Sequence, residues 1–71
     1  MSLPISELSL TERQIEVLNL LARGNTGNNI AMKLGISVCT VRIHIRNTMQ
    51  KLEAINIPHA VARAYAAGII S

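Results

Sequence analysis

The sequence has almost no aromatic side chains. Its 71 residues include one tyrosine and neither tryptophan nor phenylalanine. The hydrophobic residues, 49% of the chain, are therefore mainly leucine, isoleucine, valine, methionine and alanine. This composition favours short, closely packed helices over a β-sandwich. We predict one small all-α domain, near the lower size limit for a single hydrophobic core.

Cysteine and long apolar runs are scarce as well. Cys39 is alone, which excludes a disulfide framework and a multi-cysteine metal site and predicts an intracellular, cytoplasmic protein. No apolar run approaches the roughly 18 residues of a membrane span, and the first residues lack the basic stretch of a secretory signal. We expect no metal, no other cofactor and no membrane partner.

The groups that enzymes use are also missing. The sequence shows no pair of carboxylates, no activated nucleophile and no cluster of metal ligands. A domain of this size also offers no deep cleft for a substrate. We therefore expect that the chain is not an enzyme.

Acidic residues are absent from one segment. Residues 30–52 hold four basic residues and no acid, namely Lys33, Arg42, Arg46 and Lys51. The residues before this segment have a net charge of −1 and those after it a net charge of 0, so the segment carries all of the chain's excess of +3. Positive charge confined to one segment points to a polyanionic partner.

Four helices are predicted, over residues 11–23, 27–34, 38–53 and 58–67, after a lead-in or linker remnant at 1–9. Thr11 and Gln14 have the spacing of a capping box. Gly35-Ile36-Ser37, between the second and third helices, is typical of a helix-turn-helix because glycine ends one helix and serine caps the next. Each predicted helix starts next to a side chain that can cap it: Thr11, Thr26, Ser37 and Asn56.

The helix predicted over 38–53 has two unlike sides. At about 100° per residue, Arg42, Ile43 and Arg46 share one stripe with Cys39 and Gln50. Two arginines around an aliphatic side chain suit a DNA major groove, because arginine can hold guanine O6 and N7 while the aliphatic group packs on a thymine methyl. A plain solvated surface would show the same stripe, so periodicity leaves both interpretations open. The opposite side predicts a buried face: Val41, Ile45, Thr48, Met49 and Leu52.

Four segments resemble the LuxR-type, or GerE-type, helix-turn-helix domain of bacterial transcription regulators. In order and at the usual spacing, they are LTERQIEVLNLLARG, NNIAMKLGIS, TVRIHIRNTMQKL and HAVARAYAAGI. The resemblance implies a four-helix domain over residues 10–71 that binds double-stranded DNA sequence-specifically and regulates transcription. It also implies that helix 38–53 enters the major groove and that the last helix forms a dimer. RNA polymerase is a further candidate partner.

The resemblance also implies roles for single residues. Base contacts would come from Arg42, Ile43 and Arg46. Contacts to the sugar-phosphate backbone would come from Lys33, Thr40 and Lys51.

Small residues in the last predicted helix allow two interpretations. Ala60, Ala64 and Ala67 can pack on the domain's own core, or they can meet a second copy, because alanines let two helices approach closely. Ile69 and Ile70 would extend such a dimer contact. The resemblance favours the dimer.

The chain departs from the family pattern at several positions. Gly27-Asn28-Asn29 replaces a common Asn-Lys-Glu and so lacks a lysine that would suit phosphate, and Val38-Cys39 replaces a more polar pair. Glu53 stands where glycine is common. The first two departures keep an alternative function open, a helical protein-interaction module that retains the fold and has weak or no DNA binding.

Overall fold

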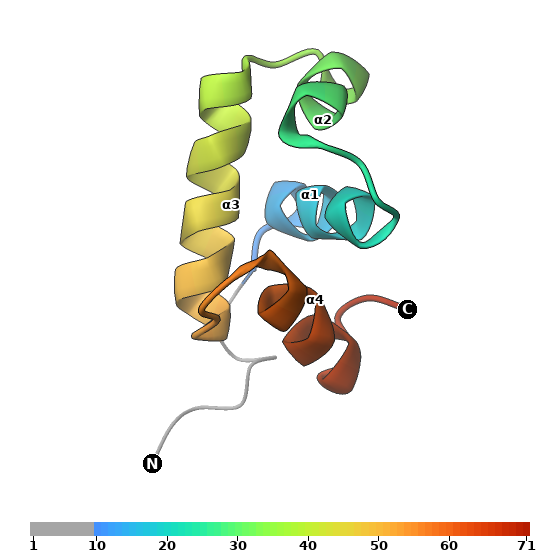
Figure 1. Cartoon of the computed structure of the whole chain (residues 1–71), viewed down its shortest axis with the longest axis vertical. Coiled ribbons are helices and arrows are strands. Elements are labelled where there is room, and N and C mark those ends of the chain that lie inside the picture. Colours follow the sequence, from blue (N-terminus) through green and yellow to red (C-terminus); the bar gives the residue numbers. More distant parts are fainter. Residues whose placement is uncertain (1–9) are drawn as a thin grey trace.

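The computed structural model describes residues 10–71, which form four helices and no strand. They are α1 (Glu12–Ala22), α2 (Gly27–Leu34), α3 (Val38–Leu52) and α4 (Ile57–Ala66). The longest helix, α3, stands along one side, and the others lie beside it from α2 at one end to α4 at the other (Figure 1). The all-α prediction is confirmed, and each helix limit lies within one residue of its predicted position. The predicted lead-in, residues 1–9, lies outside the described residues.

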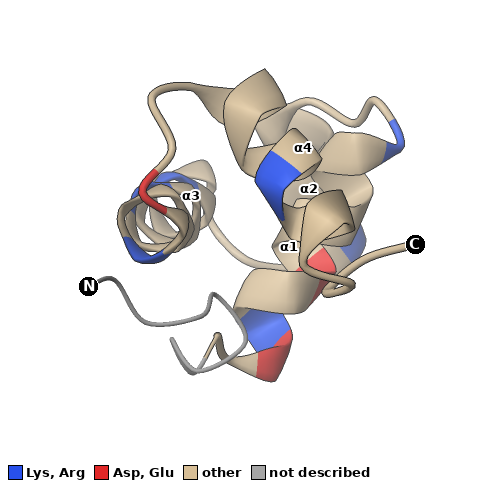
Figure 2. Cartoon of the chain, turned by 90° about the horizontal axis from the view of Figure 1, so that it is seen from below, with Lys and Arg blue, Asp and Glu red and all other residues tan. Residues whose placement is uncertain are grey.

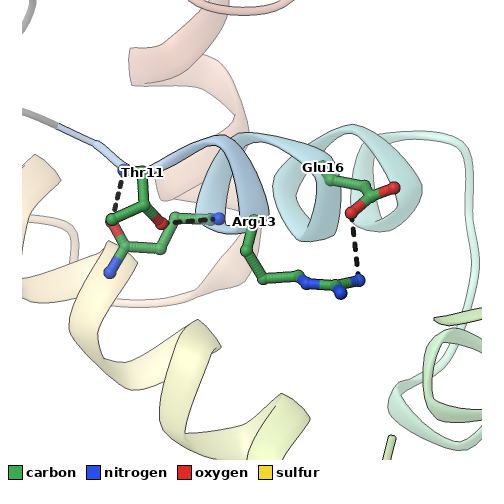
Figure 3. A network of polar contacts seen from close by, with 4 residues as sticks. Thr11, Arg13 and Glu16 are labelled. Carbon is green, nitrogen blue, oxygen red and sulfur yellow. Dashed lines mark hydrogen bonds and ion pairs between the residues drawn. The ribbon is translucent and has the colours of Figure 1, made fainter. Parts of the chain in front are cut away.

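All four predicted capping side chains are confirmed. Thr11 Oγ1 accepts a hydrogen bond from the Gln14 amide at 3.0 Å, and Gln14 Oε1 accepts one from the Thr11 amide at 3.0 Å (Figure 3). Each such cap contributes about 0.5–2 kcal/mol, which helps helices as short as α2 to start at a defined residue. The other three caps are Thr26, Ser37 and Asn56.

The connection between α2 and α3 is a tight turn, as predicted. Gly35 ends α2 with φ +68°, in the left-handed region that favours glycine. The Ile36 amide then donates to the Ala31 carbonyl at 3.1 Å, and Ser37 accepts from the Thr40 amide at 3.1 Å. The two helices are thus joined as a helix-turn-helix.

The core consists of two clusters, which α1 connects. Val17 of α1 packs with Ile30 of α2 and Val41 of α3, and all three are at most 1% exposed. The adjacent Leu18 belongs to the second cluster, which joins α1 to the end of α3 and to α4. Consecutive residues of α1 therefore hold both halves of α3 against the domain. The remaining members of the second cluster are Leu52, Ala60, Ala64 and Ile70.

The buried alanines of α4 correct one prediction. Ala60 is 2% exposed and Ala64 is 0% exposed, so their side chains are covered by their own domain. Their assignment to a dimer contact is wrong, because they leave no surface for a second copy to touch. Ile70 is also core, at 4% exposure. Ala67, at the C-cap of α4, is half-buried.

A polar contact that the sequence did not predict joins α3 to α4. The Arg63 side chain of α4 donates through Nε to the Leu52 carbonyl, in the last turn of α3. The Arg63 guanidinium also lies 4.0 Å from the Glu53 carboxylate. A cation at this helix end is favourable because the last carbonyls carry partial negative charge.

Candidate nucleic-acid interface

The predicted stripe of α3 faces solvent. Arg42 and Arg46 are exposed, and Ile43 between them is 55% exposed. On the opposite side Val41 and Leu52 are fully buried. The predicted division of α3 into an outer and an inner side is thus confirmed, and we call Cys39, Arg42, Ile43, Arg46 and Gln50 the outer stripe.

The two arginines of the outer stripe keep their charge available for a partner. Neither Arg42 nor Arg46 forms an ion pair within residues 10–71, whereas Arg13 pairs with Glu16 on α1 at 3.1 Å (Figure 3). Figure 2 looks nearly along α3 and shows this helix to one side of the other three. A guanidinium without an intramolecular acid can form two hydrogen bonds to one base edge or phosphate.

Two of the predicted backbone contacts flank the α2–α3 turn. Lys33 is exposed in the last turn of α2. Thr40, in the first turn of α3, is half-exposed and its hydroxyl shares a hydrogen bond of 2.9 Å with the Ser37 hydroxyl. The start of α2 offers no cation, because Asn28 and Asn29 are the exposed residues there.

The third predicted backbone contact, Lys51, has a structural partner. Its Nζ donates to Gln14 Oε1 at 3.0 Å, and Gln14 is only 6% exposed. The same oxygen accepts the Thr11 amide, so one glutamine joins the start of α1 to the end of α3. Lys51 itself is half-buried. The sequence held no signal for this contact. The two residues are 37 positions apart, and the local helix pattern around Gln14 says nothing about the helix that carries Lys51.

A groove that the sequence did not predict runs beside the outer stripe. It has a volume of about 460 Å³ and lies between α3 and the start of α4. Its apolar side chains are Ile45 and Met49 of α3, Ala54 of the connection and Ile57 of α4. Its polar side chains are Arg42, Arg46, Gln50 and Glu53.

Two other kinds of site are absent from the described part of the chain. Across residues 10–71, no three histidine, cysteine, aspartate or glutamate side chains come together as a metal site would require. No helix in the same range is long and apolar enough to cross a membrane.

The family follows from comparison with known proteins. The family model for bacterial regulatory proteins of the luxR family matches residues 8–64, which include the whole of α1, α2 and α3. The chain belongs to this family. The predicted resemblance is confirmed, and so is the prediction of DNA binding in transcription regulation at the level of the family.

The luxR-family relatives share most of this chain. Transcriptional activator protein CarR of Pectobacterium carotovorum subsp. carotovorum is 44% identical over 55 residues, covering 78% of this chain and 22% of CarR. Transcriptional activator protein SolR of Ralstonia nicotianae is 42% identical over 67 residues, covering 94% and 28% of the two chains. Transcriptional regulatory protein FixJ of Rhizobium meliloti is 40% identical over 60 residues, covering 84% and 29%. The chain thus spans less than a third of the length of these relatives.

Proposed function

We propose that this luxR-family domain places α3 in the major groove of DNA and reads bases through Arg42, Ile43 and Arg46. The observation that carries this proposal is the outer stripe, where two arginines without an internal acid flank an isoleucine that is 55% exposed. A helix fits the width of the major groove, and these side-chain types match guanine and thymine edges.

Phosphate contacts would fix the position of α3 in the groove. Lys33 and Thr40 lie on the two sides of the α2–α3 turn, and Lys51 lies in the last turn of α3. Contacts at both ends of a recognition helix set its register, whereas its middle residues read the sequence. Lys51 would have to share its ammonium between a phosphate and Gln14.

The test compares a base contact with a phosphate contact. Duplexes are first selected from a random pool with the wild-type protein, and Arg42→Ala is then titrated against a selected and a scrambled duplex. We expect a loss of about 1–3 kcal/mol, confined to the selected duplex, if Arg42 holds a guanine. Arg13→Ala on α1 is the control and should bind both duplexes as the wild type does. Equal losses on both duplexes would reduce Arg42 to a phosphate contact.

Dimerisation through α4 remains part of the proposal, with a different surface from the one first predicted. Of the exposed residues of α4, Pro58, Ala62, Tyr65 and Ala66 share one side of the helix, and Tyr65 is 48% exposed. A two-fold pair of such surfaces would place two copies of α3 on half-sites about one DNA turn apart. This face is small and apolar, as a helix-to-helix contact requires.

Tyr65→Lys tests the dimer. We expect this variant to lose cooperative binding to two adjacent half-sites and to keep the wild-type affinity for one half-site. Met32→Lys on α2, where the methionine is 81% exposed, is the matched control and should bind cooperatively. Wild-type binding without cooperativity at every half-site spacing would contradict dimerisation.

The rival function, a protein-interaction module that has lost DNA binding, rests on the start of α2 and on Val38-Cys39. Neither position supplies a cation to the surface around α3. A gel shift at low salt separates the two functions, because nonspecific phosphate contacts strengthen as salt is lowered. Absence of any shift would favour the rival.

A further inference from the structure

The groove beside the outer stripe combines two kinds of surface. Its lining includes the apolar side chains of Ile45, Met49 and Ile57, from two helices, which we call the floor. Its lining also includes Arg42 and Arg46 of α3, the residues proposed to read bases, which we call the rim. A DNA base edge could use the rim, but DNA offers no segment that would fill an apolar groove of about 460 Å³. The floor is therefore unexplained by DNA binding.

The domain's own side chains do not fill the space around this floor. Ile45 and Met49 are half-buried, and Ile57 is 38% exposed. An apolar group from outside that covered these three side chains would remove their exposed apolar surface from water.

Charge changes from one end of the groove to the other. Arg42 and Arg46 carry positive charge without an acid partner in residues 10–71, whereas Glu53 at the far end lies 4.0 Å from Arg63. At 1.5 Å rise per residue, Arg42 and Arg46 are about 6 Å apart along α3, and Arg46 and Glu53 about 10 Å. An occupant that matches this surface needs negative charge only at the arginine end.

We propose that this groove binds an acidic amphipathic helix of a partner protein. One large aliphatic side chain of the partner lies on the floor of Ile45, Met49 and Ile57. Two carboxylates, four residues apart on the partner helix, face Arg42 and Arg46, because residues four apart on any α-helix share the same spacing of about 6 Å. Guanidinium and carboxylate can then pair through two hydrogen bonds each. This is helix-in-groove recognition with a charged rim.

Such a partner would exclude DNA from the same domain. Arg42 and Arg46 cannot face carboxylates and base edges at once, so binding of the helix removes the proposed base contacts. This consequence rests on the proposed function, whereas binding of the helix itself does not. The two are therefore measured separately.

The probe is a synthetic, helix-stabilised peptide with two glutamates four residues apart and a leucine between them on the same face. Its binding to the full 71-residue chain is measured by fluorescence anisotropy without DNA. One control peptide carries glutamine in place of both glutamates, and another carries serine in place of the leucine. We expect each control to bind at least tenfold more weakly. Equal binding of the glutamate and glutamine peptides would overturn the proposal.

Two variants of neighbouring isoleucines locate the binding site. Ile57→Ser removes part of the floor and should weaken peptide binding at least fivefold. Ile55→Ser is the matched control, since Ile55 lies just before α4, is 83% exposed and does not line the groove. Equal effects of both variants would overturn the assignment to the groove.

Methyl chemical shifts of the wild type decide the question even if Ile57→Ser fails to fold. The peptide should shift the methyl signals of Ile45, Met49 and Ile57 and leave that of Met32 on α2 unchanged. Shifts centred elsewhere would overturn the proposal.

A competition experiment tests whether the peptide excludes DNA. The peptide should displace a selected DNA duplex from the domain. A ternary complex of peptide, domain and DNA would overturn the competition alone, and failure of the wild type to bind DNA would concern only the proposed function.

Discussion

Helices α3 and α4 each bury one side in the core. On α3 the buried and exposed sides carry different residue types, whereas on α4 both sides carry alanine. On α3 the inner residues include Val41 and Leu52 and the outer residues include Arg42 and Arg46. On α4 alanines lie on both sides: Ala60 and Ala64 are buried, and Ala62 and Ala66 are exposed. A residue pattern therefore predicts the orientation of a helix only where its two sides differ in polarity.

This difference explains which site predictions succeeded. The orientation of α3 was predicted correctly because arginine cannot be buried without a partner, whereas valine and leucine gain free energy from burial. Alanine has little surface to gain or lose, so either side of α4 could have been the core. The contact of α4 with α3 and α1, rather than its sequence, decided that Ala60 and Ala64 lie inside.

The largest effect is expected from enlarging a buried alanine of α4. Ala64→Leu inserts three carbon atoms into a site that is 0% exposed, so we expect a loss of about 1–3 kcal/mol in the free energy of unfolding. Ala62→Leu, on the exposed side of the same helix, should change stability by less than about 0.5 kcal/mol. Urea denaturation measures both, and equal losses would contradict the assignment of the two sides.

The next largest effect on stability is expected at one of the two lysines predicted to contact phosphate, because Lys51 forms a hydrogen bond within the domain. Lys51→Ala removes the hydrogen bond to Gln14 and should lower the free energy of unfolding by about 1 kcal/mol. Lys33→Ala on exposed α2 should leave stability within about 0.5 kcal/mol. Both variants should flatten the salt dependence of DNA binding by about one unit of slope. An unchanged slope for either variant would remove that lysine from the phosphate contacts.

A stabilising change is expected at the end of α3. Glu53 has φ +55°, a left-handed conformation that glycine adopts without strain. Relief of this strain should outweigh the loss of its exposed ion pair with Arg63, so Glu53→Gly should raise the free energy of unfolding by about 1 kcal/mol. Glu53→Ala, which loses the pair and keeps most of the strain, is the control. A stabilisation of equal size in both variants would show that the carboxylate, rather than the backbone, is unfavourable.

The smallest effect is expected for the exposed ion pair of α1. Arg13 and Glu16 are 42% and 51% exposed, and solvent screens their attraction. Arg13→Ala should therefore change the free energy of unfolding by less than about 0.5 kcal/mol. A double-mutant cycle with Glu16→Ala measures the pair itself. A coupling above about 1 kcal/mol would contradict the expected screening of this pair.

Most of the fold could be predicted because its signals are local. The capping side chains of all four helices accept from backbone amides three residues ahead, and Gly35 acts on its own backbone. The left-handed conformation of Glu53 also lies where the family pattern favours glycine. None of these features depends on which helices later pack together.

The sequence by itself determined the four helices, the turn between α2 and α3, and the side of α3 that faces solvent. Tertiary structure alone decided the side of α4 that is buried, the contact of Lys51 with Gln14, the contact of Arg63 with the end of α3, and the groove that Ile57 completes. The physical reason is the range of the interactions. Caps and periodicity act within one or two helical turns, whereas these other features join side chains from helices whose relative placement no local pattern specifies.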